Sequence, residues 1–265
     1  MKKCSIKNRV FIALLASTFG GTATIATSKA WADDGQFSLS SGFGSSPGNY
    51  ATANTTGLFS IPTIEKYETG PWVFKLTVPD LSISGTGSVV PEIGRIRTGS
   101  AANSTQSDLG DTVAAATYNI YSGSASTFGI GLTGKVKLGM ADKIKGFGTG
   151  QNDYAAQADA YQSFDKFTAL GSLGYKVLGS PAGISMDPVL YGSFGGIYQL
   201  NDQMSGGVDI SLAQSPSATA AEQRQLTAYV THMINKSLKA RGYVLKGFTN
   251  GSPDSGLGAQ VYYGF

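Results

Sequence analysis

The chain has 265 residues, of which only 14% are charged, and it contains 36 glycines, 13 tyrosines and 13 phenylalanines. Its formal charge of +3 comes from 20 basic and 17 acidic residues, but five of the basic residues fall within the first 32 positions. The 15 basic residues that follow are outnumbered by the acids, which gives no electrostatic basis for binding a polyanion. No nucleic-acid partner is therefore expected.

The first 32 residues are predicted to form a secretory signal peptide. Lys2 and Lys3 belong to a basic start without acids, residues 10–16 are apolar, and the small-x-small tripeptide "AWA" ends at Ala32. These three features define a cleaved leader, and the apolar run is too short for a membrane-spanning helix. Because the only cysteine, Cys4, lies in this leader, the domain of residues 33–265 is expected to have no disulfide.

After residue 34 the chain divides into about twelve segments of roughly ten residues, most with alternating apolar and polar positions. Ten residues is the length of a tilted strand that crosses a bilayer. Short and long connections alternate between the segments, as in barrels with tight turns at one end and loops at the other, whereas a soluble β-sandwich does not sort its connections in this way. The predicted strands are 35–44, 55–66, 71–83, 109–121, 128–140, 152–163, 167–178, 189–200, 204–214, 222–233, 237–248 and 256–265.

The sequence therefore predicts an all-β fold, a transmembrane antiparallel up-and-down β-barrel of about 12 strands in the bacterial outer membrane. In segment 128–140, Ile130 and Leu132 share one face, whereas Lys135 and Lys137 share the other. An apolar face toward outer-membrane lipid and a polar face toward water inside require this alternation. By the same parity, we expect eight charged residues to line the lumen: Lys75, Lys135, Lys137, Asp159, Lys176, Asp209, Lys239 and Arg241.

The chain ends in an alternating strand with an aromatic last residue. Val261, Tyr263 and Phe265 occupy one face of this strand. The last strand of a barrel must pair with the first, because unpaired backbone groups in hydrocarbon are costly. This ending also resembles the C-terminal signal of bacterial outer-membrane proteins, which implies the barrel assembly machinery as a partner.

Several longer blocks resemble one family of small bacterial outer-membrane proteins. They are "TIEKYETGPWVFKLTVPDLSISGTGSVV", "LGDTVAAATYNIY", "GTGQNDY" and "GYKVLGSPAG". Members of that family are labelled transporters and are associated with phenol and other aromatic-degradation pathways of the MetA-pathway type. The resemblance implies an outer-membrane barrel transporter but brings no binding residues with it, because the blocks are strand and turn sequences.

Catalytic and metal sites have little support in the sequence. His232 is the only histidine, and its parity places it on the lipid-facing side near the end of its segment, so we do not expect an enzyme. No cluster of acids and histidine has the spacing of a metal site, and the glycine strings do not precede a phosphate-binding helix. No cofactor and no metal are expected.

The function predicted from these features is an outer-membrane channel or transporter that passes small solutes through a narrow polar lumen. Aromatic and anionic solutes are the candidate classes, the latter because basic residues outnumber acids on the predicted inner face by six to two. The alternative is a non-conducting barrel with a structural or adhesive role. Twelve strands enclose a lumen between that of filled eight-stranded barrels and that of open porins, so both readings remain.

Three finer expectations follow from the assumed registers. Lys135 should face Gln157 with Asp159 diagonally next to it, so that the lysine and the aspartate form an ion pair. Lys239 and Arg241 have no acid in register, which leaves them to attract an anion. The longest connection, residues 84–108, is expected to gate or narrow the external mouth.

Overall fold

The computed structural model describes residues 35–50, 52, 54–85, 89–90, 93–95, 104–122 and 128–265; the predicted signal peptide lies outside these ranges. In this part of the chain, no helix is long and apolar enough to cross a membrane. The strands are β1 (Gln36–Ser45), β2 (Gly57–Thr69), β3 (Trp72–Gly85), β4 (Val89–Val90), β5 (Gly94–Arg95), β6 (Ser104–Leu109), β7 (Thr112–Ser122), β8 (Phe128–Leu138), β9 (Asp153–Phe164), β10 (Phe167–Val177), β11 (Val189–Gln199), β12 (Met204–Ala213), β13 (Gln223–Met233), β14 (Leu238–Gly247) and β15 (Ser255–Gly264).

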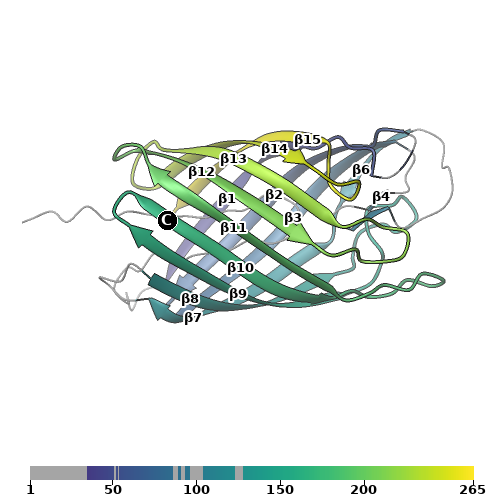
Figure 1. The fold of residues 1–265 in the computed structure, drawn as a ribbon, viewed down its shortest axis with the longest axis horizontal. Helices are drawn as coiled ribbons and strands as arrows, with labels where there is room; N and C mark the ends of the chain where they lie inside the picture. The colour runs from purple at the N-terminus through teal and green to yellow at the C-terminus, as the bar shows by residue number, and fades with distance from the viewer. Residues whose placement is uncertain are drawn as a thin grey trace, which may run out of the picture.

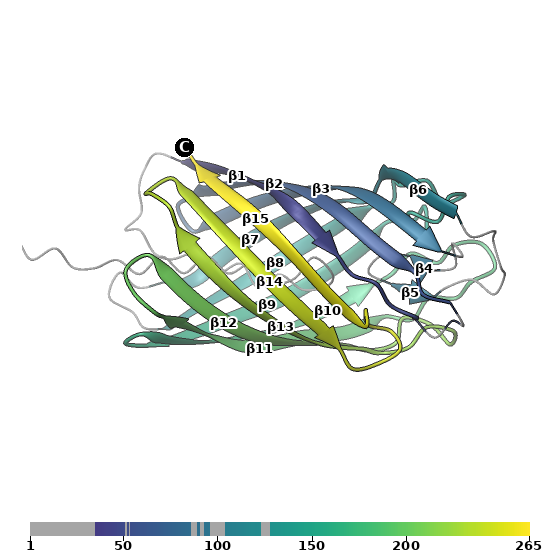
Figure 2. The same ribbon diagram turned by 90° about the horizontal axis from the view of Figure 1, so that it is seen from above.

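Twelve of these strands form a closed antiparallel barrel, in which the strands are strongly tilted against the long axis (Figures 1 and 2). From β7 to β15 each strand pairs with the next one in the chain, and β1, β2 and β3 close the ring between β15 and β7. The C-terminus and the tight turns lie at one end, here called the short-turn end, and the longer loops lie at the other, the loop end. The predicted fold class and strand number are confirmed.

The barrel wall has two chemically different faces. In β10, Leu173 and Tyr175 are exposed on the outside. Gly174, which lies between them, and Leu170 have the opposite parity and are buried inside. The same alternation makes an outer surface of large apolar side chains, among them Phe74, Phe194 and Val261. A surface of this kind on a closed sheet is the one that a lipid bilayer covers.

Two prolines interrupt the wall where the sequence predicted regular strands. Pro62 and Pro79 lie opposite each other in the β2–β3 pair. A proline has no N–H to donate, so it is tolerated where a ladder is broken. The β1–β2 ladder skips the stretch containing Pro62, and the partner of β3 changes from β6 to β7 beside Pro79, whose carbonyl accepts a bond of 2.8 Å from the Gly110 N–H.

This break corrects one predicted strand and one predicted loop. The segment 109–121 was expected to be continuous, but β7 begins only at Thr112, and Ser104–Leu109 forms the separate strand β6. Residues 84–108 are accordingly not one simple connection, since they also contain the small β4–β5 hairpin. The alternation rule could not detect the break, because it depends on hydrogen bonding around Pro79 and not on hydrophobicity.

The seam between the first and last strands includes the terminal aromatic. Val261 pairs with Ser41 and Tyr263 with Leu39. The Phe265 N–H donates to the Phe37 carbonyl at 3.0 Å, and its ring lies 5.5 Å from that of Phe37 and 4.9 Å from that of Tyr263, centroid to centroid. The last residue therefore adds a hydrogen bond and ring packing to the closing pair of strands.

We predict that Phe265 acts mainly during assembly. Deleting it removes the terminal aromatic but only one of the many hydrogen bonds of the seam. Outer-membrane insertion should therefore fall strongly. The protein that does insert should keep its resistance to unfolding in unheated detergent gels. Phe265→Trp should restore insertion, and Phe248→Ala, which removes an exposed aromatic at the loop end, serves as the control. Equal surface levels of the deletion and the wild type would contradict this assignment.

Candidate functional site

The eight charged residues singled out in the sequence all occupy inward positions of the barrel strands. Asp159, Asp209 and Arg241 are each less than 5% exposed, and the five lysines are partly buried. Their chain neighbours face outward, as Phe74 and Leu76 do on either side of Lys75. The structure therefore brings these charges into the barrel interior, where they belong to several distinct groups.

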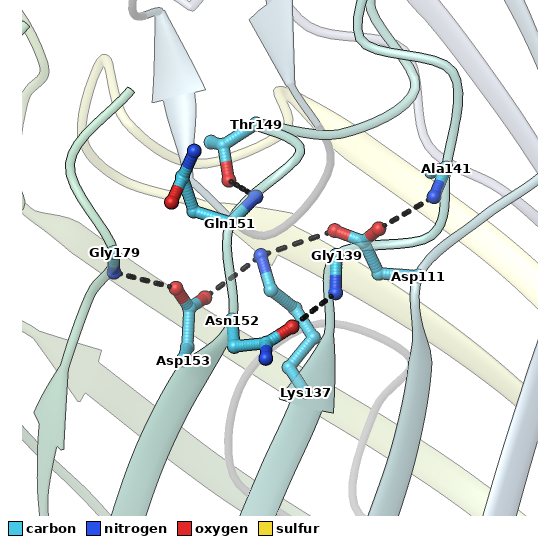
Figure 3. A network of polar contacts seen from close by, with 9 residues as sticks. All are labelled: Asp111, Lys137, Gly139, Ala141, Thr149, Gln151, Asn152, Asp153 and Gly179. Atoms are coloured by element: carbon cyan, nitrogen blue, oxygen red, sulfur yellow. Dashed lines mark hydrogen bonds and ion pairs between the residues drawn. The ribbon is translucent and has the colours of Figure 1, made fainter. Parts of the chain in front are cut away.

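Lys137 lies at the loop end between two carboxylates (Figure 3). Its ammonium is 3.1 Å from Asp111 Oδ2 and 2.7 Å from Asp153 Oδ2, with all three side chains at most 10% exposed. The other carboxylate oxygens accept bonds of 2.9 Å from the backbone N–H groups of Ala141 and Gly179. This group connects β7, β8 and β9 with the loops that follow β8 and β10.

The charge of Lys137 is thus balanced by two acids that the sequence analysis did not count. Asp153 shares the inward parity of Gln157 and Asp159, so the alternation rule could have found it. Asp111 lies in the break between β6 and β7, where the rule gives no face. The predicted excess of six basic residues over two acids is consequently smaller in the structure.

A chain of polar contacts crosses three strands around Asp159. Thr117 and Thr133 share a hydrogen bond of 2.8 Å, and Thr133 donates to Asp159 Oδ2 at 3.1 Å. Gln157 donates to the other oxygen of Asp159 and accepts a bond of 2.6 Å from the Lys135 ammonium. The network holds the buried carboxylate of Asp159 with neutral donors on β8 and β9.

The expected register between these strands is wrong by two residues. Lys135 lies opposite Ala155, and Gln157 lies opposite Thr133. Lys135 still reaches Gln157, but diagonally, and Gln157 connects it to Asp159. The reason is the loop of residues 139–152, which packs against Asp111, Tyr50 and Leu58 and so does not set the register by a tight turn.

Two lysines meet one aromatic ring near the loop end. The ammonium groups of Lys135 and Lys176 each lie 5.6 Å from the ring centroid of Tyr191. Tyr191 is 6% exposed and lies directly across from Gly174, where a side chain would collide with the tyrosine ring. The electron-rich ring face stabilises both cations, as is usual for ammonium groups over aromatic rings.

Arg241 belongs to an aromatic group on β13–β15. Its guanidinium carbon lies 3.6 Å from the ring centroid of Tyr229, and Asp209 and Tyr262 are close enough to interact electrostatically with it. Gly207 makes room for the Tyr229 ring, since a Cβ there would lie 2.3 Å from it. No acid stands in register with Arg241, as expected, but Asp209 reaches it from β12. The sequence did not predict that Tyr229 and Tyr262 lie beside this arginine.

Oxygen atoms beside this group add to the polarity of the interior. Within the described residues, Asp209 Oδ1, Ser211 Oγ and Thr227 Oγ1 are buried and have no hydrogen-bond partner. They lie close together, since Asp209 and Thr227 are opposite each other in the β12–β13 pair. These oxygens have almost no solvent-accessible surface, so the side chains on β12 and β13 pack closely around them.

Lys239, at the short-turn end, lies within electrostatic range of Lys66 and Glu68. Lys66 and Glu68 themselves form an ion pair of 2.8 Å with about a quarter of each side chain exposed. Both are inward residues of β2 that the sequence analysis left out. Segment 55–66 ended at Lys66 in the prediction, and the strand continues to Thr69.

The loop end contains two apolar clusters that share the β4–β5 hairpin. Val89 packs in one cluster with Tyr50, Leu58 and Phe147, which come from β2 and from two loops. Val90 and Ile93 pack in the other cluster with residues of β11 and of the loop before it, including Met186 and Tyr191. All three hairpin residues are at most 2% exposed. The described part of residues 84–108 therefore packs against opposite sides of the barrel mouth.

An ion pair connects the loop of residues 139–152 to β6. The Lys145 ammonium lies 2.7 Å from Asp108 Oδ2 and 3.8 Å from Asp142 Oδ2. The hydrogen bond to Asp108 raises the pKa of Lys145. Both side chains are well exposed, so salt should weaken this contact.

His232 lies where its parity predicted, exposed on the outside of β13 and opposite Met204 near the short-turn end. The described residues contain no group of three or more histidine, cysteine or acidic side chains that could hold a metal ion. The chemistry of the interior thus consists of fixed charges, hydroxyls, amides and tyrosines.

A closed antiparallel barrel with an apolar outer surface and a charged interior defines a β-barrel protein of the bacterial outer membrane. No protein-family model matches the chain, and no curated protein sequence matches it. Similar solved structures include the COG4313 outer membrane channel from Pseudomonas putida F1, with a TM-score of 0.67, 12% identity and coverage of 87% of this chain and 96% of that one. The NanC porin has a TM-score of 0.56 with 9% identity, covering 86% and 98%, and the KdgM porin has 0.53 with 11% identity, covering 86% and 99%.

Removing the Lys137 charge should destabilise the loop end of the barrel. Lys137→Gln leaves Asp111 and Asp153 facing each other with little solvent, and breaking a buried ion pair from one side costs about 3–5 kcal/mol. We expect a lower urea midpoint for unfolding from lipid vesicles. Lys166→Gln, in an exposed turn, is the control and should behave as wild type. A Lys137→Gln midpoint equal to that of the control would show that the carboxylates do not depend on this lysine.

Proposed function

We propose that this protein is a passive outer-membrane channel for small solutes. The observation that carries the proposal is the inner face of the barrel, where charged and polar side chains occupy positions from the short-turn end to the loop end. An interior that served only to fill the barrel could be apolar, as in a soluble core. The partly exposed lysines Lys75, Lys135 and Lys176 support a lumen that contains water, because ammonium groups are strongly hydrated.

We further propose aromatic or anionic compounds as the solute classes. The aromatic class rests on the resemblance of the sequence blocks to proteins associated with phenol degradation. The anionic class rests on the inward lysines, including Lys75, Lys176 and Lys239. Outer-membrane lipid and the barrel assembly machinery are the other proposed partners, on the basis of the apolar outer face and the terminal aromatic of the chain.

A non-conducting barrel with a structural or adhesive role is the second candidate. One observation favours it, namely the packing of Val89, Val90 and Ile93 into the two apolar clusters at the loop end. If this hairpin seals the mouth permanently, the polar interior below it serves the stability of the wall alone. If the hairpin only narrows the mouth, solutes pass beside it.

Single-channel recording in planar bilayers distinguishes the two candidates. We expect small, resolved conductance steps for the wild type, and larger steps for Val90→Ser with Ile93→Ser, because two buried apolar contacts of the hairpin are lost. The control pair Met140→Ser with Ile144→Ser changes exposed apolar residues of a neighbouring loop and should leave the step size unchanged. If neither the wild type nor the hairpin variant conducts while both are folded in gels, the channel function is wrong.

A further inference from the structure

Four inward lysines lie on a single register row of the barrel wall. Lys66 of β2 is directly opposite Lys75 of β3, and Lys75 is opposite Ala115 of β7. Ala115 is opposite Lys135 of β8, which is opposite Ala155 of β9, and Ala155 is opposite Lys176 of β10. The positions between the lysines are thus alanines, whose small side chains leave the long lysine side chains room along the wall. We call Lys66, Lys75, Lys135 and Lys176 the lysine row.

The row climbs from near the short-turn end of the barrel toward the loop end. Lys66 lies three residues before the end of β2 at the short-turn end, whereas Lys176 is the next-to-last residue of β10 at the loop end. A row of paired residues is perpendicular to the strands, so in a barrel of tilted strands it climbs as it goes around. Five steps of about 4.8 Å cover roughly 24 Å along the wall, of which about 15 Å is a rise along the axis.

Further charges lie beside both ends of the row. Lys239 is within electrostatic range of Lys66 and so extends the basic surface at the short-turn end. Glu68, in its ion pair with Lys66, and Asp159, which interacts electrostatically with Lys135 and Lys75, are two of the acids beside the row. Near its loop end, Lys137 follows Lys135 on β8 and pairs with Asp111 and Asp153. With Lys137 and Lys239, six basic groups lie against these four acids, so the surface along the row is net positive.

The loop end of the row lies next to the apolar mouth. Lys135 and Lys176 flank Tyr191, and Tyr191 packs in the same cluster as Val90 and Ile93 of the hairpin. Beyond the ion-paired group of Lys137, an anion that passes the hairpin therefore meets two ammonium groups and an aromatic ring. From there the next lysine of the row, Lys75, is about 10 Å farther along the wall from Lys135, by two interstrand steps.

We propose that the lysine row is the translocation path for small organic anions, with carboxylates as the substrate class. This inference rests on the proposed channel function and deepens it. Lysine offers a compact, hydrated charge on a flexible stem and does not clamp a carboxylate with two fixed donors as arginine does. Several weak sites in sequence are what conduction requires, because a solute must enter each site and also leave it.

The spacing of the row supports transfer from site to site. Neighbouring lysines are separated by one or two interstrand steps, about 5 to 10 Å, a distance similar to the screening length in 0.1 M salt. The field of one ammonium group therefore overlaps that of the next. A single cluster at the mouth would attract anions without moving them, whereas a row that climbs the wall provides a continuous attractive surface.

The test is the reversal potential of open channels across a gradient of potassium chloride, repeated with potassium benzoate as the organic probe. The wild type should prefer anions in both salts. The variant Lys75→Gln with Lys135→Gln and Lys176→Gln should lower the anion-to-cation permeability ratio roughly two- to eightfold at 0.1 M salt, and much less at 1 M. The control Lys143→Gln with Lys166→Gln and Lys246→Gln removes the same charge from exposed positions and should keep the wild-type ratio.

The outcomes separate this inference from the channel function on which it rests. A conducting wild type without anion preference, or a row variant with the same ratio as the control, overturns the lysine row and leaves the channel. A wild type that does not conduct overturns both. If the triple variant does not fold, Lys176→Gln alone, checked for its folded band in gels, should shift the ratio in the same direction, and an unchanged ratio overturns the row.

Discussion

The constraint on which this structure depends is that no backbone N–H or C=O group can be left unpaired in hydrocarbon. A sheet satisfies this condition only if it closes, and the pairing of β1 with β15 closes it. Closure divides every strand into an outer and an inner face, because successive residues point to opposite sides of the wall. The apolar outside and the charged inside are both consequences of this single requirement.

The closed sheet of tilted strands also determines which inward side chains become neighbours. Lys66 and Lys176 are far apart in the chain but belong to one row. A series of residue pairs on adjacent strands connects them. Two of the places where the ladder is interrupted contain Pro62 and Pro79, which cannot donate a hydrogen bond. The break beside Pro79 lies where the chain passes from β6 to β7, on its return from the hairpin that packs at the mouth of the barrel.

The wall could be predicted from the sequence and most of the interior could not. Alternation alone placed Lys135 and Asp159 on the same face, since it needs only the period of a strand. It missed the two-residue shift between β8 and β9, because the intervening loop is held by contacts with Asp111, Tyr50 and Leu58, which come from other parts of the chain. It also missed the partner of Lys137 at Asp111, which lies in the ladder break. Tyrosine positions such as Tyr229 and Tyr191 follow the parity of their strands, but their contacts with Arg241 and Lys176 depend on registers.

Charge-selective labelling of a cysteine on the lysine row tests most directly whether a wet, positive path runs along it. In a Cys4→Ser background, which has no other cysteine, Ala115→Cys places a thiol between Lys75 and Lys135 on the row, and Asp202→Cys in an exposed turn is the reference. Each variant is treated with a sulfonated and with a trimethylammonium methanethiosulfonate reagent. The ratio of the anionic to the cationic rate should be several times higher at residue 115 than at residue 202. Equal ratios, or a residue 115 that neither reagent reaches while residue 202 reacts, would contradict the account.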